Sequence, residues 1–199
     1  MEHMIIAVGR RYGSGGHEIG KRLAKRLDIP FYDRELVELA SKKSGIDRGI
    51  LELHNERAVQ ATLLKTKSGF GGRPVGELLF QTQSQIIREL AEQGPCVIIG
   101  RCANYVLQDR TDLFSVFVTA PVEKRTQRIM ERNRMSREDA RTAVEKVDRQ
   151  RQEYYSHYAG REWGEADGYD VTVDSSILGI DGTAELLEEQ ARAFARCLI

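Results

Sequence analysis

The chain has 199 residues, of which 41% are hydrophobic and 30% are charged. This composition supplies the core of one domain of ordinary size, so we expect residues 1–199 to fold as one unit. It excludes a disordered chain and a disulfide-rich miniprotein. The 30 Lys and Arg residues balance the 30 Asp and Glu residues to a formal net charge of zero. No overall field therefore favours polymeric nucleic acid or an anionic membrane surface as a partner.

The cysteines and the first residues bear on the compartment. Cys96, Cys102 and Cys197 are odd in number and lack ligand spacing, so they predict neither a disulfide framework nor a zinc site. Residues 1–6 contain no charged segment followed by a long apolar stretch, and no apolar run approaches the roughly 20 residues of a membrane span. We expect a reduced, cytoplasmic protein with no membrane partner. A homo-oligomer is compatible with the sequence.

Short apolar runs alternate with helical patterns along most of the chain. Residues 4–8 form the first predicted strand, and the helical pattern of residues 17–27 follows a glycine-rich loop. The further predicted strands are 29–32, 96–99, 113–118 and 169–173, and the further predicted helices are 34–43, 76–93, 121–134, 136–155 and 183–198. Residues 44–74 have no clear periodicity, apart from a predicted loop at 68–74.

Each predicted strand is a short apolar run, and helices separate the strands. This pattern is typical of a parallel sheet that is buried on both faces. The expected fold class is therefore α/β, with a three-layer, five-stranded parallel sheet and helices on both faces. Ligands of such sheets bind at the carboxyl ends of the strands. The glycine loop after residues 4–8 and Gly100-Arg101 after residues 96–99 stand at these ends.

The glycine loop is the first candidate site. Glycines let a backbone curl around phosphate oxygens, and the N-terminus of the following helix offers free N–H groups. The residues expected to contact an anion there are Arg10, Arg11, Gly13, Ser14, Gly15, Gly16 and His17. The loop departs from the pattern G-x-x-x-x-G-K-[ST], because Gly9 precedes Gly15 by six positions and Gly16-His17 replace Lys-[ST]. The alternative is a tight strand-to-helix turn that binds nothing.

Arginines are the second candidate feature. Residues 124–151 hold ten basic and five acidic residues, so the neutral total conceals a cationic segment. Guanidinium groups suit phosphate, and phosphoryl transfer gathers negative charge that a protein must neutralise. Arg128, Arg132, Arg149 and Arg151 are the candidates for that role. The alternative is a solvated helix face with local ion pairs.

Arg101 lies at the end of a strand that is predicted to be buried. A guanidinium at such a place needs an anion, which is either a bound ligand or a carboxylate such as that of Asp33. His17 is as compatible with an exposed helix residue as with a phosphate contact. The aromatic residues around Tyr154 and Trp163 are more typical of packing than of a platform for a base.

Five segments of the chain resemble the cytidylate kinase-like family. They are residues 6–20 (IAVGRRYGSGGHEIG), 31–36 (FYDREL), 94–103 (GPCVIIGRCA), 148–155 (DRQRQEYY) and 169–176 (YDVTVDSS). Their order along the chain makes the resemblance specific, and it covers essentially the whole sequence. The family is related to bacterial cytidylate kinases, which are P-loop enzymes that transfer the γ-phosphoryl group of ATP to CMP or dCMP.

The resemblance implies a role for each candidate residue. Gly13 to Gly16 match the loop that holds the ATP phosphates, and Arg128 and Arg132 resemble the arginines of a lid. The residues that the resemblance implies for acceptor binding and closure are Asp33, Arg34, Gly100, Arg101, Asp148, Arg149 and Arg151. It also implies a P-loop kinase-like fold with an acceptor-binding insert at about 34–93, a lid at about 124–165, and ATP with Mg²⁺.

Two departures from the family pattern bear on the function. Gly16 stands in place of the loop lysine, for which Arg10, Arg11 and His17 are the candidate replacements. Cys102 stands in place of the aspartate that reads the base. The expected function is an ATP-dependent phosphotransferase that acts on CMP, dCMP or a related small acceptor, with no protein metal site. The alternatives are a non-catalytic nucleotide-binding regulatory module and a kinase for a non-nucleotide acceptor.

Overall fold

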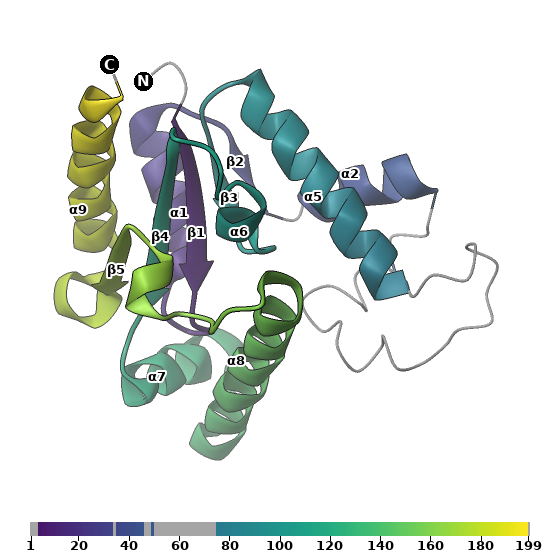
Figure 1. Ribbon diagram of the computed structural model, residues 1–199. Coiled ribbons are helices and arrows are strands. Elements are labelled where there is room, and N and C mark those ends of the chain that lie inside the picture. The colour runs from purple at the N-terminus through teal and green to yellow at the C-terminus, as the bar shows by residue number, and fades with distance from the viewer. Residues whose placement is uncertain (1–3, 34, 46–48, 50–74, 199) are drawn as a thin grey trace.

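The computed structural model describes residues 4–33, 35–45, 49 and 75–198 (Figure 1). Within these residues, five strands form one parallel sheet in the order β2-β3-β1-β4-β5. The strands are β1 (Ile5–Arg10), β2 (Phe31–Tyr32), β3 (Cys96–Ile99), β4 (Leu113–Thr119) and β5 (Val171–Asp174). The predicted α/β class and the five-stranded parallel sheet are confirmed.

Helices connect the strands and cover both faces of the sheet. They are α1 (Gly16–Leu27), α2 (Glu35–Ser44), α5 (Val75–Gln93), α6 (Ala103–Val106), α7 (Val122–Asn133), α8 (Arg137–Ala159) and α9 (Ser175–Cys197). A 3₁₀ turn, η1 (Ala166–Gly168), precedes β5. In Figure 1 the two chain ends lie together at one end of the sheet, and α7 and α8 lie at the opposite end, where β1 terminates.

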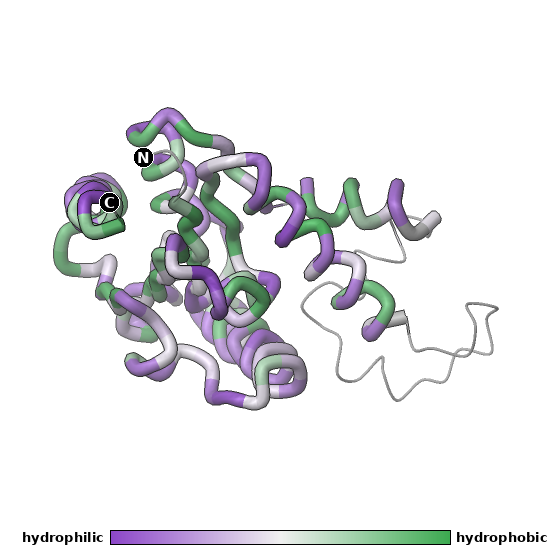
Figure 2. Tube along the Cα trace, turned by 45° about the horizontal axis from the view of Figure 1, so that its top comes forward, coloured by the Kyte–Doolittle hydropathy of each residue, from purple (hydrophilic) through white to green (hydrophobic). Residues whose placement is uncertain are grey.

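β1 is the central strand, and its side chains alternate between two hydrophobic cores. Ile5 and Ala7 belong to a core that α2, α5 and α6 cover, whereas Ile6 and Val8 belong to a core that α1 and α9 cover. The hydrophobic colour in Figure 2 accordingly concentrates on the central strands. Burial of both faces explains why these strands are continuous apolar runs in the sequence.

The C-terminal helix begins earlier than predicted. α9 starts at Ser175 instead of residue 183, and the Asp174 carboxylate accepts a hydrogen bond from the Ser176 N–H at 2.8 Å. Gly179, with φ at 69°, then leaves the helical conformation. Because of this interruption, the sequence shows no helical periodicity in the first turn of α9.

Two further regions differ from the prediction or lie beyond it. The one-turn helix α6 was not predicted, because four residues are too few to show a period. The predicted loop at 68–74 lies outside the described residues.

An aromatic cluster fastens α8 to the ends of β4 and β5. Its buried members include Phe117, Tyr155, Trp163 and Tyr169, and the rings of Phe117 and Trp163 meet edge to face at 5.4 Å. The Tyr155 hydroxyl accepts a hydrogen bond from Asn104 at 2.9 Å, which ties α8 to α6. These aromatic residues therefore serve packing, as the sequence predicted.

Candidate active site

The glycine loop connects β1 to α1 at the carboxyl end of the sheet. Gly13 and Gly15 have φ values of 79° and 83°, a region that L-residues seldom adopt, so these positions require glycine. Gly15 is the N-cap of α1 and has no side chain to cap the helix, and the Ser14 hydroxyl accepts a hydrogen bond from the Gly16 N–H at 3.3 Å. The other first-turn amides, with the positive end of the helix dipole, remain suited to an anion.

The start of α9 packs beside this loop. The Ser175 hydroxyl donates a hydrogen bond to the backbone carbonyl of Ser14 at 2.5 Å, and Ser14 is fully buried. A Cβ atom at Gly15 would lie 3.2 Å from the Ile180 side chain. Ser175 thus supports the loop; it lies in the segment 169–176 that resembles the family, but it was not among the predicted site residues.

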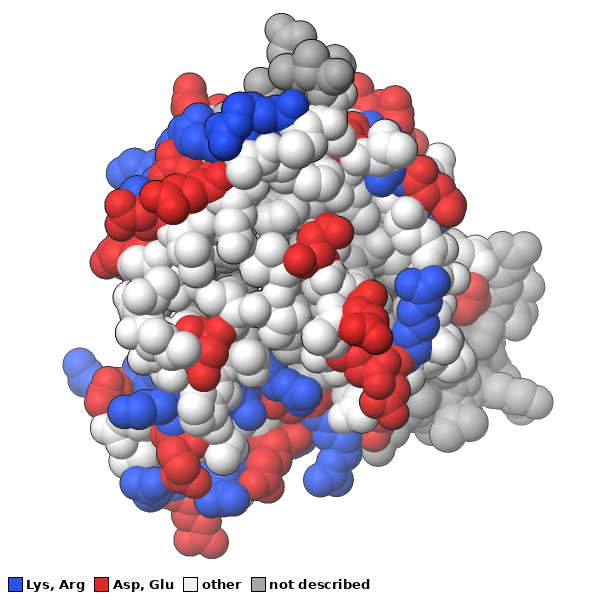
Figure 3. Space-filling model, turned by 60° about the vertical axis from the view of Figure 1, so that its left-hand side comes forward, with Lys and Arg blue, Asp and Glu red and all other residues white. Residues whose placement is uncertain are grey.

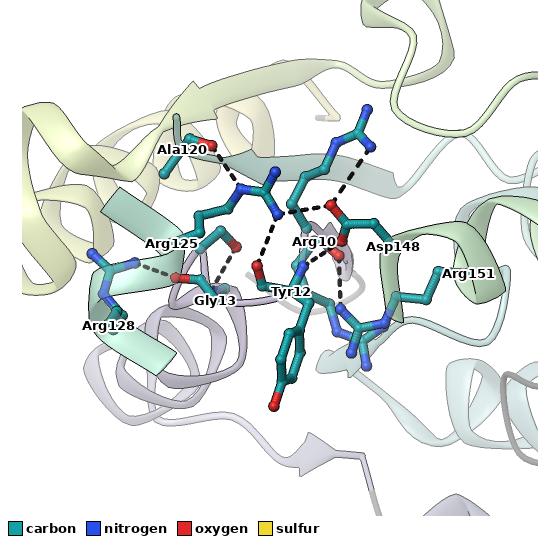
Figure 4. Close-up of polar contacts among 11 residues, drawn as sticks. Arg10, Tyr12, Gly13, Ala120, Arg125, Arg128, Asp148 and Arg151 are labelled. Atoms are coloured by element: carbon teal, nitrogen blue, oxygen red, sulfur yellow. Dashed lines mark hydrogen bonds and ion pairs between the residues drawn. The ribbon is translucent and has the colours of Figure 1, made fainter. Parts of the chain in front are cut away.

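Three arginines from α7 and α8 donate hydrogen bonds to backbone carbonyls of the loop (Figure 4). Arg151 donates to the Arg10 carbonyl at 3.1 Å, Arg125 to the Tyr12 carbonyl at 3.0 Å, and Arg128 to the Gly13 carbonyl at 2.7 Å. These helices are the segment that the sequence predicted as a lid. In the described structure these three arginines hold the loop itself.

Asp148 anchors the same loop through a buried ion pair. One of its carboxylate oxygens accepts a hydrogen bond from the Tyr12 N–H at 2.7 Å, and the other accepts one from Arg125 at 2.7 Å (Figure 4). The side chains of Arg125 and Asp148 are 9% and 11% exposed. The structure therefore gives Asp148 a position at the loop, while its predicted contact with an acceptor stays a prediction. The inward-facing Arg125 was not among the predicted site residues.

The remaining predicted arginines make different contacts. Arg11 stacks over Trp163, with its guanidinium carbon 4.8 Å from the ring centre. Arg132 donates a hydrogen bond to the Tyr12 hydroxyl at 3.3 Å. Arg149 is exposed and makes no ion pair with any residue in the described part of the chain. The described structure therefore gives no contact that supports the predicted role of Arg149.

A strained turn follows β3. Gly100, Arg101 and Cys102 have successive φ values of 70°, 57° and 55°. Left-handed conformations cost non-glycine residues about 1–2 kcal/mol each, and such strain persists at functional sites where the surroundings enforce it. The turn directs the Arg101 side chain, which is 4% exposed, toward Asp33 at the end of β2, with 3.9 Å between charged atoms. The ion-pair alternative for Arg101 is therefore present in the structure.

Asp33 is the point at which several basic groups converge. His17 lies 2.9 Å from one Asp33 oxygen, and Arg101 approaches the other. Burial would raise the pKa of Asp33, but the hydrogen bond from His17 and the charges of Arg10 and Arg101 outweigh it and hold this pKa below its ordinary value. Asp33 is therefore ionised at neutral pH. The neighbouring predicted residue, Arg34, lies outside the described residues.

The structure contains two spaces of very different size, one at the site and one lined by other residues. The space between the strand ends and the aromatic cluster, lined by Arg10, Arg101 and Trp163, holds about 20 Å³, enough for a single water molecule. A cavity of about 280 Å³ lies between α5, α6 and α8, with Phe80 and Arg88 in its wall. Its size approaches that of a small-molecule site.

The surface charge around the site is mixed. In Figure 3 basic and acidic side chains alternate over the lower part of the molecule, where Figure 1 places α7 and α8. Arg137 and Arg141 both pair with Glu123, and Arg141 also pairs with Glu145. The outer face of the predicted lid is thus exposed to solvent. The arginines of these helices that turn inward are the ones that donate hydrogen bonds to the loop. No helix in the described ranges is long and apolar enough to cross a membrane.

Three known proteins resemble the chain over nearly its whole length. A cytidylate kinase of Methanopyrus kandleri is 26% identical over 194 residues, which cover 93% of this chain and 91% of that protein. The crystal structure of an uncharacterized protein from Eubacterium ventriosum superposes with a TM-score of 0.72 at 26% identity, covering 95% of this chain and 98% of that chain. The shikimate kinase of Bacteroides thetaiotaomicron, at 14% identity with a TM-score of 0.56 and coverage of 95% and 98%, shares the fold.

The family model described as the cytidylate kinase-like family matches residues 5–177, a span that includes the glycine loop, the strained turn and both helices of the predicted lid. The chain shares the P-loop kinase fold with this shikimate kinase. On these grounds the chain belongs to the cytidylate kinase-like family.

Proposed function

We propose that this protein transfers the γ-phosphoryl group of MgATP to CMP, dCMP or a related small acceptor. The observation that carries the proposal is the pairing of the glycine-capped N-terminus of α1 with a strained turn that holds Arg101 across the site. The first suits the phosphates of the donor and the second an anionic acceptor. The two features stand at neighbouring strand ends, as in-line transfer requires.

The ATP phosphates would lie on the amides of Gly15 and His17. The Gly16 N–H, which donates to the Ser14 hydroxyl at 3.3 Å, would exchange that partner for a phosphate oxygen. The carbonyls of Tyr12 and Gly13 are already occupied by Arg125 and Arg128, so the loop is held in shape before any ligand arrives. This preorganisation lowers the cost of binding. Burial lowers the pKa of Arg128. A phosphate beside it would stabilise the charged form of its guanidinium.

An apolar surface for the base lies next to the loop. Ile177 and Leu178 are 77% and 51% exposed, which is unusual for side chains of this size. They lie between Ser175, which is bonded to the loop, and Ile180, which packs on Gly15. A base that stacks on this pair would place its triphosphate at the N-terminus of α1.

Mg²⁺ would enter the site as part of MgATP. No group of three metal-ligating side chains occurs among the residues that the structure describes. Magnesium commonly takes most of its ligands from phosphate oxygens and water, with one or two carboxylates. The ionised Asp33 is one carboxylate that the site offers; the other, Asp148, is already bonded to Tyr12 and Arg125. The chemistry of transfer then depends on charge and position, so no side-chain nucleophile is needed.

A hydroxyl acceptor is the second candidate, and the contact between His17 and Asp33 favours it. With its Nδ1 on Asp33, His17 presents its other ring nitrogen outward, and a carboxylate that orients a histidine is the arrangement of a general base. A phosphate acceptor needs no such base, whereas an alcohol does.

Titration calorimetry with MgATP, followed by an assay of ADP release with each nucleoside monophosphate, tests the proposal. We expect MgATP to bind and CMP or dCMP to stimulate ADP release. Arg101→Ala should raise the KM for that acceptor at least about tenfold, since a charge-assisted contact is lost. The matched control, Arg137→Ala on the solvated face, should leave it unchanged. Binding without turnover on any acceptor contradicts the proposal and supports a non-catalytic module.

A further inference from the structure

Gly16 occupies the position at which a P-loop kinase carries its phosphate-binding lysine. It opens α1, directly beside the amides that bind phosphate in the proposed function, on which the following inference rests. Near a transferring phosphoryl group a side-chain cation stabilises the charge that collects on the leaving phosphate. A site that lacks this cation transfers the phosphoryl group more slowly. A kinase without the lysine therefore needs a cation from another residue.

The structure shows why position 16 is glycine. A Cβ atom built on Gly16 would lie 2.5 Å from the Cβ of Arg10, 3.3 Å from its Cγ and 3.1 Å from the Cβ of Val118. Two of these atoms are Cβ atoms, which move only when the backbone moves. No side chain fits at position 16 while the Arg10 side chain has its present course. The side chains of residues 10 and 16 therefore compete for one volume.

The Arg10 side chain occupies that volume and carries a positive charge across the start of α1. Its stem passes over Gly16, and its guanidinium is near enough to Asp33 to lower the pKa of that carboxyl. The residue is 9% exposed and lines the space at the strand ends together with Gly100 and Arg101. A cation thus reaches the same region from β1 that a lysine would reach from α1.

The backbone of Arg10 is fixed independently of its side chain. Arg10 is the last residue of β1, and its carbonyl accepts the hydrogen bond from Arg151 at 3.1 Å (Figure 4). The register with β4 pairs Arg10 with Val118. Because strand and lid both hold this residue, its guanidinium starts from a defined point, as a group that stabilises a transition state must.

We propose that Arg10 is the catalytic cation that replaces the P-loop lysine, and that Arg10 and Gly16 form a reciprocal pair in which one position supplies the cation and the other must be glycine. When MgATP binds, the guanidinium contacts the β- and γ-phosphate oxygens. During transfer an acceptor oxygen forms a bond to the γ-phosphorus as the bond to the bridging oxygen breaks. The electron pair stays on ADP, where Arg10 balances the charge, and a monophosphate dianion as acceptor has no proton to lose.

An exchange of the two residues tests this pairing. The variants are Arg10→Met, which keeps the stem and removes the charge, Gly16→Lys, and the double variant R10G/G16K. MgATP and AMP binding are measured by calorimetry, and turnover by ADP release, on protein whose thermal unfolding is recorded for every variant. Arg110→Met is the matched control, because Arg110 pairs with Asp112 at the far end of β4.

We expect Arg10→Met to weaken MgATP binding at least about tenfold and to leave AMP binding nearly unchanged, since the lost contact is to the outer phosphates. Gly16→Lys should lower the unfolding temperature and MgATP affinity, because two side chains then compete for one volume. R10G/G16K should exceed both single variants in MgATP affinity and turnover. If Arg10→Met binds MgATP as the wild type does, or if the double variant fails to exceed both single variants, the inference is wrong. If wild-type protein does not bind MgATP, the proposed function fails instead.

Discussion

Asp148 offers the sharpest test of how the glycine loop is held. Asp148→Ala removes both acceptors that fix this loop, the one for the Tyr12 N–H and the one for Arg125. The Arg125 side chain is 9% exposed, so its charge would be left in the interior with only backbone carbonyls as partners. Loss of one member of a buried ion pair is far more damaging than loss of an exposed one.

The expected cost is about 3–5 kcal/mol, the range for breaking a buried pair from one side. In a protein of this size 1 kcal/mol corresponds to about 2–4 °C, so the unfolding temperature should fall by about 6–20 °C. Asp148→Asn keeps an oxygen for the Tyr12 N–H, but it replaces the oxygen that accepts from Arg125 with an NH2 group, so the charge and that hydrogen bond are lost. Its expected cost is smaller, about 1.5–3 kcal/mol, as for one hydrogen bond to a charged group.

Urea unfolding monitored by circular dichroism gives the free energy of unfolding for each variant. Glu123→Ala is the matched control, since it removes a carboxylate from the same pair of helices that binds only the exposed Arg137 and Arg141. Its expected cost is at most about 1 kcal/mol. The double variant R125M/D148L should recover much of the loss, because an apolar pair leaves no buried charge.

Loss of the Asp148 anchor should weaken MgATP binding as well as lower the free energy of unfolding. In Asp148→Asn, which is expected to remain folded, the Kd for MgATP should rise by about tenfold, because a loop that is ordered only on binding costs affinity. A free energy of unfolding for Asp148→Ala within about 1 kcal/mol of the wild-type value would refute the anchoring role. Unchanged MgATP affinity in the asparagine variant would refute the link between this anchor and the site.

Three other predictions follow from single contacts. The pKa of Asp33 is held below its ordinary value of 3.8, so this carboxylate stabilises the fold above that pH and the contribution is lost as pH falls below it. The difference in unfolding free energy between wild type and Asp33→Asn, measured by urea titration, should therefore be largest near neutrality and shrink in acid. At pH 2.5, about 1.3 units below the ordinary pKa, the difference in unfolding free energy should be clearly smaller than at neutral pH. A difference that stays constant down to this pH would contradict the lowered pKa of Asp33. Gly13→Ala should cost more than Gly160→Ala in thermal unfolding, since both residues have positive φ but only the Cβ at Gly13 would meet a backbone atom, at 2.8 Å. Equal costs would mean that the loop yields to the added methyl group. Thiol titration of native protein with an aromatic disulfide should modify the exposed Cys197 rapidly and Cys96 only on unfolding, since burial raises the pKa of Cys96 to about 12. Fast reaction at Cys96 would mean that β3 opens under native conditions.

The sheet was predictable because its strands are buried on both faces. A strand such as 96–99 must be a continuous apolar run, and its predicted bounds coincide with those of β3. The start of α9 was not predictable, since Gly179 breaks the period one turn into the helix. Local patterns thus reveal elements that tertiary burial makes regular, and they miss elements that a turn interrupts.

The site was predictable in its residue types more than in its contacts. The sequence predicted an anion site at Gly13–Gly16 and named Asp33 as an alternative partner of Arg101, and the structure brings these residues to neighbouring strand ends. It did not show that Arg125 turns inward to the loop, because helical spacing alone leaves the direction of the face open. The competition between residues 10 and 16 arises only when β1 and α1 are packed together.

Phosphorus NMR of the wild-type protein with MgATP and CMP tests the central claim most directly. The spectrum reports the binding of the donor, through shifts of the β- and γ-phosphorus resonances, and the transfer itself. The account predicts that these resonances shift on binding and that ADP and CDP then appear in equal amounts. Unshifted resonances, together with unaltered ATP in the presence of every nucleoside monophosphate, would contradict it.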